Sequence, residues 1–247
     1  RFGEAGSTVV IEEFMEGEEA SLLAFVDGKT VVPMIASQDH KRIFDGDKGP
    51  NTGGMGTYAP APVLTDALRD EAMKTILEPM VAAMEKEGMP YVGCLYAGLM
   101  ITPQGPKVVE FNARFGDPET QVVLPLLDSD LGQIMMACAT GTLTADMVKW
   151  KDSSAACVIL ASKGYPETSS KGDVIHGDIK QHDTTIVFHS GTKLIGDEYV
   201  TNGGRVLGVV GLGKDLRTAL DRAYGRIEHI DFEGMQYRTD IGAKAFK

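Results

Sequence analysis

One stretch, residues 108–119, constrains the fold and the chemistry of this chain more than any other. It begins as an apolar strand and ends in a turn, and successive side chains of an extended strand point to opposite faces. Glu110, Asn112 and Arg114 are therefore expected on one face of that strand. The side chains between them are expected to face a core: Val109, Phe111 and Ala113.

The polar face of this strand predicts phosphate chemistry. Oxygen ligands on alternate residues stand about 7 Å apart along the backbone and can converge on one hard cation. The guanidinium of Arg114, one step further along, can grip phosphate oxygens with two parallel hydrogen bonds. A metal site beside an arginine indicates phosphoryl transfer from a nucleotide. The alternative is a half-exposed edge strand whose polar face is simply solvated.

Composition narrows the possible partners. The 247 residues can form one large domain or two small ones, and no run of about 18 apolar residues predicts a membrane span. A net charge of −11 disfavours a broad nucleic-acid surface, although a local cationic pocket for a phosphorylated small molecule remains possible. Cys94, Cys138 and Cys157 lack metal-ligand spacing, which favours reduced thiols in the cytoplasm.

The first third of the chain predicts an antiparallel meander followed by a loop. Residues 8–15 and 20–26 are read as buried strands, and Asp27-Gly28 predicts a hairpin turn into residues 30–35. Five glycines and one proline within residues 46–56 predict a long irregular loop. Its backbone N–H groups would suit an anion, and the alternative is a flexible surface loop.

The centre of the chain alternates helices with a hairpin. Thr65 or Asp66 caps a helix that runs to Gly88, and Pro79 is expected to kink or split it. Residues 92–101 and 107–111 are expected to pair as a hairpin. Further helices are expected to start at Asp117-Pro118 and to cover residues 133–139.

A break in the pattern around residues 148–154 predicts two domains, 1–150 and 151–247. The first is expected to be α+β, with a largely antiparallel sheet and flanking helices. The second is a small mixed α/β domain with strands at 155–161, 185–189 and 206–211 and a helix at 215–228. Arg205 stands at a strand entrance, either as a solvated charge or as a phosphate anchor.

Four segments resemble a known family when they are taken in order. Residues 11–21 resemble the nucleotide hinge of ATP-grasp ligases. Together with residues 38–42, 49–56 and 110–119, they are similar to the phosphoribosylamine–glycine ligases of purine biosynthesis. The resemblance implies an ATP-grasp core followed by the small C-terminal domain. It also implies ATP and Mg²⁺ or Mn²⁺ as cofactors, and ligation of glycine to 5-phosphoribosylamine through glycyl phosphate.

The resemblance assigns roles to individual residues. Glu12 and Met15 would meet adenine through their backbone, and Glu19 would bind the ribose. Glu110 and Asn112 would hold the metal, while Arg114 and Asp117 would act at the reacting groups. The remaining residues would bind the two acceptor substrates: Asp39, Lys41, Asn51, Thr52, Gly53, Gly54, Met55, Gly56 and Arg205.

This sequence differs from the members of that family in what lies upstream of the matching segments. Family members have an N-terminal domain and a lid with a phosphate-binding lysine upstream of this stretch. Only residues 1–12 would belong to the lid here, so we expect the chain to need its missing N-terminal half for turnover. The rival hypotheses are a different ATP-grasp ligase and a non-catalytic nucleotide-binding fragment. The sequence leaves open whether the protein is a monomer or a dimer.

Overall fold

The first sheet grows from β1 (Glu18–Asp27), whose centre is an unbroken buried run from Ala20 to Val26. The computed structural model describes residues 3–246, so the first two residues of the predicted lid segment lie outside it. β1 pairs with β2 (Val31–Pro33) and β7 (Val92–Thr102), and β7 pairs with β8 (Gly105–Asn112). Every pairing is antiparallel, as the meander and hairpin patterns predict.

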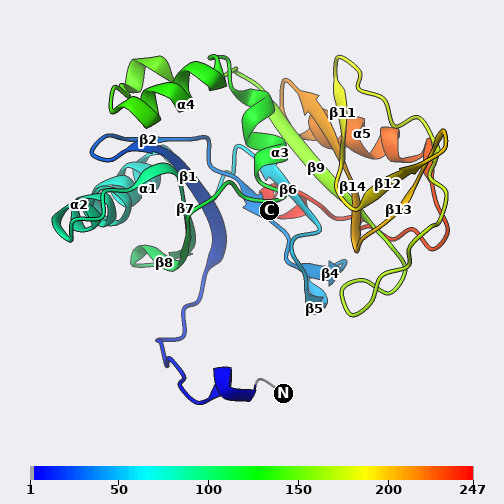
Figure 1. Ribbon diagram of the computed structural model, residues 1–247, viewed down its shortest axis with the longest axis horizontal. Helices are drawn as coiled ribbons and strands as arrows, with labels where there is room; N and C mark the ends of the chain where they lie inside the picture. The colour runs from blue at the N-terminus through cyan, green and yellow to red at the C-terminus, as the bar shows by residue number, and fades with distance from the viewer. Residues whose placement is uncertain (1–2, 247) are drawn as a thin grey trace.

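Helices pack against both faces of this sheet, the helices of residues 66–86 against one face and the helix of residues 131–140 against the other (Figure 1). Thr65 caps α1 (Asp66–Ala72), which continues through a π-helical segment (Met73–Leu77) into α2 (Glu78–Lys86). The predicted disturbance by Pro79 is confirmed, because the π segment ends two residues before Pro79, which has no N–H to donate. α4 (Leu131–Thr140) ends at Gly141, whose φ of 69° suits a left-handed cap.

The second sheet joins strands from both predicted domains. Its order is β11–β14–β9–β6–β3, again antiparallel throughout. β11 (Thr185–His189), β14 (Arg205–Gly213) and β9 (Ser154–Ala161) confirm the three predicted strands. β6 (Gly56–Ala59) and β3 (Gln38–Asp39) come from the first half of the chain. The division into two domains at residue 150 stays a prediction. The second sheet contains strands from both sides of that residue.

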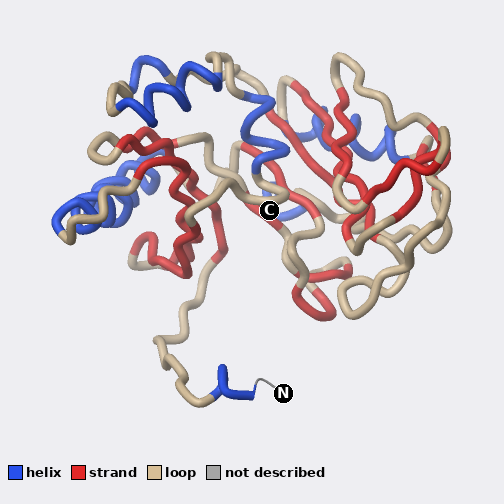
Figure 2. Tube along the Cα trace, viewed as in Figure 1, coloured by secondary structure: helices blue, strands red, loops and turns tan. Residues whose placement is uncertain are grey.

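α5 (Leu216–Ile227) packs on one face of the second sheet, as predicted, and α3 (Thr120–Val123) packs on the other. Figure 2 shows the two sheets side by side, with α3 and loops between them. No helix among residues 3–246 is long and apolar enough to cross a membrane. The small elements are β4 (Arg42–Phe44), β5 (Lys48–Asn51), β10 (His176–Gly177), β12 (Thr192–Ile195), β13 (Glu198–Thr201), β15 (Ile230–Asp231), and short helices at Gly3–Gly6, Leu124–Leu126, Ala145–Met147 and Ala243–Phe246.

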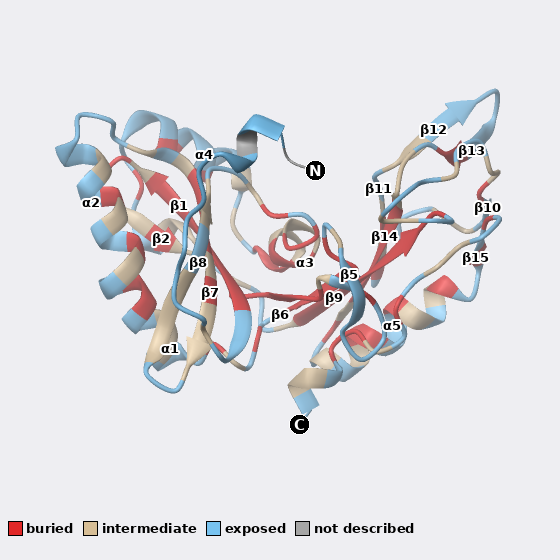
Figure 3. Cartoon of the chain, turned by 90° about the horizontal axis from the view of Figure 1, so that it is seen from below, coloured by how far each residue is buried: buried red, intermediate tan, exposed pale blue. Residues whose placement is uncertain are grey.

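The strand predicted at residues 8–15 is wrong. This segment is irregular and leads away from β1, and its apolar side chains are exposed, Ile11 at 92% and Phe14 at 88% (Figure 3). A β-branched run becomes a strand only where another strand offers its backbone groups and a surface covers its side chains. Among the described residues, no strand pairs with this segment and no surface covers its apolar side chains.

Three smaller predictions also need correction. The loop at 46–56 is interrupted, because β5 pairs with β4 as a short hairpin before β6 begins. The helix predicted at Asp117-Pro118 begins at Thr120 instead. Val109 does not face the core: the register between β7 and β8 shifts there, and its side chain is 41% exposed. A bulge inserts one residue into a strand and turns that side chain off the expected face.

Candidate functional site

A cavity of about 300 Å³ opens beside the polar face of β8. It lies where the ends of β1, β7 and β8 meet the segment that contains β3, β4 and β5. Glu110 comes from β8, Asp39 from β3 and Asn51 from the end of β5. The polar and charged side chains that line it are Glu19, Ser21, Asp39, Lys41, Asn51, Tyr96 and Glu110.

Glu110 and Asn112 project from the same face of β8, as the alternation predicts. Their partners in β7 are Gly98 and Tyr96, and Gly98 leaves room beside the Glu110 side chain. Asn112 Nδ2 donates a hydrogen bond to Glu110 Oε1 at 3.0 Å. This contact uses the amide nitrogen, so the amide oxygen and the second carboxylate oxygen remain available to a ligand.

These oxygens fit a hard divalent cation, which prefers carboxylate and amide oxygen ligands. The rest of the coordination must come from elsewhere, because no group of three or more His, Cys, Asp or Glu side chains within residues 3–246 could hold a metal. Mg²⁺ is commonly held in this way, by one or two protein oxygens together with substrate phosphates. Glu110 and Asn112 therefore suit a cation that arrives with a nucleotide.

Lys41 supplies positive charge on the other side of the cavity. Its Nζ lies 2.9 Å from Asp39 Oδ2 and 3.8 Å from Glu19 Oε2. Burial alone would lower the pKa of Lys41, but the carboxylates, Asp39 first, raise the pKa above its ordinary value. The ammonium group is therefore charged at neutral pH and can face an anionic substrate.

Ser21 and Tyr96 form the floor of this cavity and hold a buried carboxylate behind it. Glu119, only 4% exposed, accepts hydrogen bonds from Tyr96 OH at 2.9 Å and Ser21 Oγ at 3.2 Å. Burial raises the pKa of Glu119, and the negative charge of Asp39 raises it further, against the effects of Tyr96 and Lys41. Sequence analysis assigned no role to Ser21, Tyr96 or Glu119. The two segments that carry Ser21 and Glu119 were already singled out as motifs, which was the available signal.

A second polar group surrounds Arg205 at the entrance of β14. Arg205 Nη1 donates to the carbonyl oxygens of Gly53 at 2.8 Å and Asp117 at 3.0 Å. Nη2 donates to Asp117 Oδ2 at 3.1 Å, so the guanidinium is engaged by the protein itself. Gly54 has a φ of 111°, and a Cβ there would lie 2.5 Å from Pro118 Cδ. Only glycine fits this close approach.

Asp117 also lines a larger and more open cavity, of about 750 Å³, between α3 and β11. Phe115, Ile186 and Phe188 contribute apolar walls to it. Asp117 thus joins the Arg205 group to this second opening, away from the Glu110 side chain.

Several predicted site residues lie apart from the cavities. Glu12 and Met15 belong to the irregular N-terminal segment, and Arg114 is exposed, donating to the Phe115 carbonyl at 3.1 Å. Met55 is fully buried against Ile43. The remaining two are structural in their contacts: Thr52 Oγ1 donates to the Lys41 carbonyl at 2.8 Å, and a Cβ on Gly56 would lie 2.7 Å from the Cys157 carbonyl oxygen.

Comparison with known proteins identifies the family of this chain. Residues 1–120 match the family model described as phosphoribosylglycinamide synthetase, ATP-grasp (A) domain, and residues 155–244 match the C domain of the same family. The chain belongs to the phosphoribosylglycinamide synthetase family. It is 56% identical over 250 residues to the phosphoribosylamine–glycine ligase of Caulobacter vibrioides. This alignment covers 100% of this chain and 58% of that protein.

Solved structures support the same family and fold. The crystal structure of phosphoribosylamine–glycine ligase from Thermotoga maritima superposes with a TM-score of 0.83 at 35% identity, over 94% of this chain and 57% of that one. A biotin carboxylase from Campylobacter jejuni shares the fold, with a TM-score of 0.69 at 12% identity, over 92% of this chain and 48% of that one. The chain thus spans somewhat more than half the length of these two ligases, from Caulobacter vibrioides and Thermotoga maritima.

Proposed function

We propose that this chain carries the metal and acceptor sites of an enzyme that joins glycine to 5-phosphoribosylamine at the expense of ATP. The observation that carries the proposal is Glu110, hydrogen-bonded to Asn112, sharing one cavity with Lys41 and Asp39. This arrangement places a cation site in the same cavity as a charged ammonium group. The cation would bind the polyphosphate of ATP, and the ammonium group would bind the carboxylate substrate. The names of the relatives supply the identity of the substrates.

The proposed reaction has two steps. A carboxylate oxygen of glycine bonds to the γ-phosphorus of ATP while the bond to the bridging oxygen breaks, giving glycyl phosphate and ADP. The amine nitrogen of 5-phosphoribosylamine then bonds to the acyl carbon, phosphate leaves, and the nitrogen loses a proton. The product is glycinamide ribonucleotide.

The residues of the chain divide this work between them. Glu110 and Asn112 would hold Mg²⁺ or Mn²⁺, which when bound neutralises charge on the phosphates. Arg114 would stabilise charge on the transferring phosphoryl group. The nucleotide would bind along Glu12, Met15 and Glu19. Asp39, Lys41 and Asn51 would position glycine and the amine, with the group formed by Gly53, Gly54, Asp117 and Arg205 beside them.

Glycine-dependent ADP release tests this proposal. The assay uses Mg-ATP and freshly made 5-phosphoribosylamine, with the chain alone and with the chain joined to the part of the Caulobacter relative that it does not match. We expect turnover in the joined protein and none in the chain alone, because a lid must close over the nucleotide. Tight Mg-ATP binding without glycine-dependent turnover in the joined protein would point to another acceptor, and turnover by the chain alone would contradict the need for a lid.

The proposal also places the protein in the cytoplasm. Two of the proposed substrates, ATP and 5-phosphoribosylamine, are phosphorylated metabolites, and the three cysteines, Cys94, Cys138 and Cys157, are free and buried. Repeating the assay with Mn²⁺ in place of Mg²⁺ distinguishes the two candidate metals.

A further inference from the structure

The hairpin β4–β5 has little apolar packing of its own. Of its strand residues only Ile43 is buried, and all four residues of β5 are exposed (Figure 3). A two-stranded hairpin is marginally stable in water unless something else holds it. The hairpin nevertheless connects two residues of the cavity, Lys41 and Asn51, so its placement affects the site.

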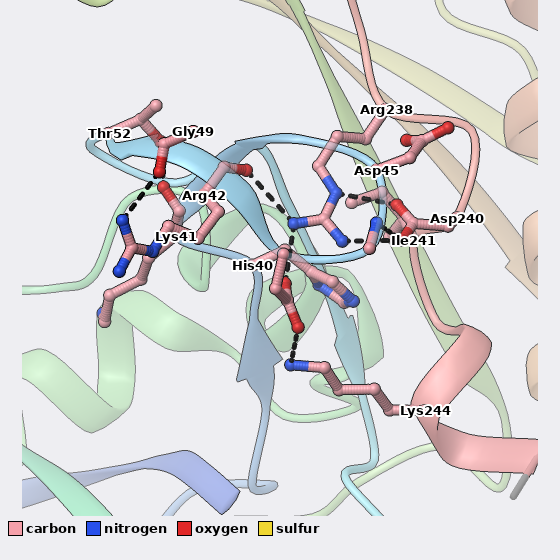
Figure 4. Close-up of polar contacts among 12 residues, drawn as sticks. His40, Lys41, Arg42, Asp45, Gly49, Thr52, Arg238, Asp240, Ile241 and Lys244 are labelled. Atoms are coloured by element: carbon pink, nitrogen blue, oxygen red, sulfur yellow. Dashed lines mark hydrogen bonds and ion pairs between the residues drawn. The ribbon is translucent and has the colours of Figure 1, made fainter.

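Arg238, from the C-terminal segment, holds this hairpin through a buried guanidinium. Its side chain is 1% exposed and reaches the hairpin from almost two hundred residues away in the sequence (Figure 4). Nη1 donates to Asp47 Oδ1 at 2.8 Å and to the Arg42 carbonyl at 3.1 Å. Nε and Nη2 donate to the two oxygens of Asp240 at 2.7 and 2.8 Å. The planar fork of arginine can satisfy all of these acceptors at once.

The neighbours of Arg238 extend the same attachment. Asp240 Oδ2 accepts from the Gly46 N–H at 2.8 Å, and Thr239 donates its N–H to Asp45 Oδ1 at 2.9 Å. Lys244 Nζ lies 2.7 Å from Asp47 Oδ2. Asp47 has a φ of 54°, the one positive value for a non-glycine residue between positions 3 and 246. Two cations thus hold a residue whose backbone conformation is unfavourable for an L side chain.

The position of the hairpin determines where Lys41 and Asn51 lie in the cavity. Lys41 immediately precedes β4, Asn51 ends β5, and Arg42 pairs with Asn51. The Thr52 N–H donates to the Lys41 carbonyl at 2.7 Å, which closes the base of the hairpin. Arg238 itself does not line the cavity. It therefore acts on Lys41 and Asn51 through the hairpin that it holds and not by direct contact with the cavity.

We propose that Arg238 is a positioning residue for the reaction, which sets Lys41 and Asn51 in the cavity by fixing the hairpin between them. The inference rests on the proposed function for its kinetic consequence. Its structural consequence, the order of the hairpin, stands independently of which reaction the cavity performs.

The test compares Arg238→Lys with Arg226→Lys. Lysine keeps the charge of Arg238 but loses the planar fork that joins Asp240, Asp47 and the Arg42 carbonyl. Arg226 is a matched control, because its side chain is 10% exposed and donates to Asp178 Oδ2 and the Lys180 carbonyl, away from the hairpin. Asp47→Asn is a milder second variant, which removes one acceptor charge from a partly exposed side chain.

Two readouts are taken well below the unfolding temperature. Hydrogen exchange of the chain should be faster in Arg238→Lys at the amides of residues 42–52, and unchanged there in Arg226→Lys. In the joined protein, kcat/KM for glycine and the amine should fall about ten- to hundredfold, because misplacement of a substrate-positioning group has effects of that size. The affinity for Mg-ATP should stay unchanged, since Glu19 and Glu110 lie on strands outside the hairpin.

The outcomes separate this inference from the proposed function. Unchanged hairpin exchange in both Arg238→Lys and Asp47→Asn overturns the positioning role, whatever the reaction. An equal kinetic loss in Arg238→Lys and Arg226→Lys also overturns it, because that result indicates general destabilisation. A joined wild-type protein without glycine-dependent turnover rejects the proposed function, while the exchange experiment still decides whether Arg238 orders the hairpin.

Discussion

Two groups of charged side chains lie at the two ends of the β4–β5 hairpin, and they are built in opposite ways. Around Arg238 the side chains of Asp47, Asp240 and Lys244 are at most 37% exposed, and each has a partner of opposite sign. Around Glu110 the pairing is less complete: Lys41 is paired with Asp39 and Glu19, whereas Glu110 accepts from the neutral Asn112 amide and leaves oxygens available in the cavity. The first arrangement fixes a structure, whereas the second is suited to receive a ligand.

This difference follows from what burial does to charge. A buried charged group without a partner is costly, so a structural cluster must satisfy its own members. A binding site leaves hydrogen-bonding capacity unused, because the ligand supplies the missing partners. Substitutions in the first group should therefore change stability, and substitutions in the second should change function with little effect on stability.

The largest expected effect tests the structural group through His40. This side chain is 1% exposed, and its Nε2 accepts a hydrogen bond from the Gly242 N–H at 3.3 Å. Burial, helped by the positive charges of Arg238 and Lys244, lowers the pKa of His40 from 6.5 to about 4. Between those values the unfolded chain binds more protons than the folded one, so acid favours unfolding. Stability should fall by about 3 kcal/mol as the pH drops from 6.5 to 4.

His40→Gln checks this expectation, because glutamine can still accept from Gly242 but does not titrate. Denaturant unfolding followed from pH 4 to 7 should show a smaller loss of stability in the variant than in the wild type. His176→Gln, at an exposed histidine, controls for the loss of an imidazole at the surface. Parallel curves for the wild type and His40→Gln would show that the buried imidazole does not drive this acid sensitivity.

Glu110→Gln tests the other side of the comparison, with the next largest effect. It removes one carboxylate oxygen charge from the proposed cation site while keeping the size of the side chain. Metal-dependent turnover of the joined protein should fall at least about a hundredfold, as expected when a group that stabilises transition-state charge is lost. The free energy of unfolding should change by less than about 0.5 kcal/mol, because Glu110 is exposed.

Glu78→Gln, at an exposed position on α2, is the matched control and should leave turnover unchanged. Isothermal titration with Mg-ATP adds a readout that does not depend on the acceptor substrates. Equal turnover in both variants would remove Glu110 from the site. Weakened nucleotide binding without any turnover in the wild type would favour the non-catalytic hypothesis.

The two regions also differ in how far the sequence predicts them. The alternation in residues 108–112 correctly places Glu110 and Asn112 on one face, because periodicity is a local property of a paired strand. The same reasoning fails one residue away, at Val109, since a bulge depends on the register of the partner strand. It also fails for residues 8–15, which have strand composition but no neighbouring strand among the described residues.

The attachment of Arg238 to Asp47 could not be predicted by such reasoning, because it joins residues 191 positions apart. A lone Arg or Asp in a polar segment looks like surface until the second sheet brings the C-terminal segment against the hairpin. The floor of the cavity was missed for a related reason. Tyr96 lies in an apolar strand and Ser21 at the start of another, so each resembles an ordinary core residue until Glu119 is placed between them.

The smallest expected effect concerns this floor, which is buried like the structural group but lines the cavity. Tyr96→Phe removes the hydrogen bond from Tyr96 OH to Glu119 Oε1 and should destabilise the fold by about 1.5 kcal/mol, because the acceptor is a carboxylate. Tyr91→Phe removes a hydrogen bond to the neutral Cys94 carbonyl and should cost about 1 kcal/mol or less. Tyr96 OH also lies 2.8 Å from Ser21 Oγ, so Ser21→Ala measured alongside separates that contact from the one to Glu119.

The same variant should move the titration of Glu119. The pKa of this carboxyl is already raised, and the hydrogen bond from Tyr96 opposes that shift, so its loss should raise the pKa further. A raised pKa means that the folded state binds the proton more tightly, so this contribution to stability is present at low pH and lost as the pH rises through the folded pKa. Carboxyl NMR titration of wild type and Tyr96→Phe measures the shift directly. An unchanged pKa would mean that Ser21 and the backbone alone satisfy Glu119, and that the floor belongs with the structural group.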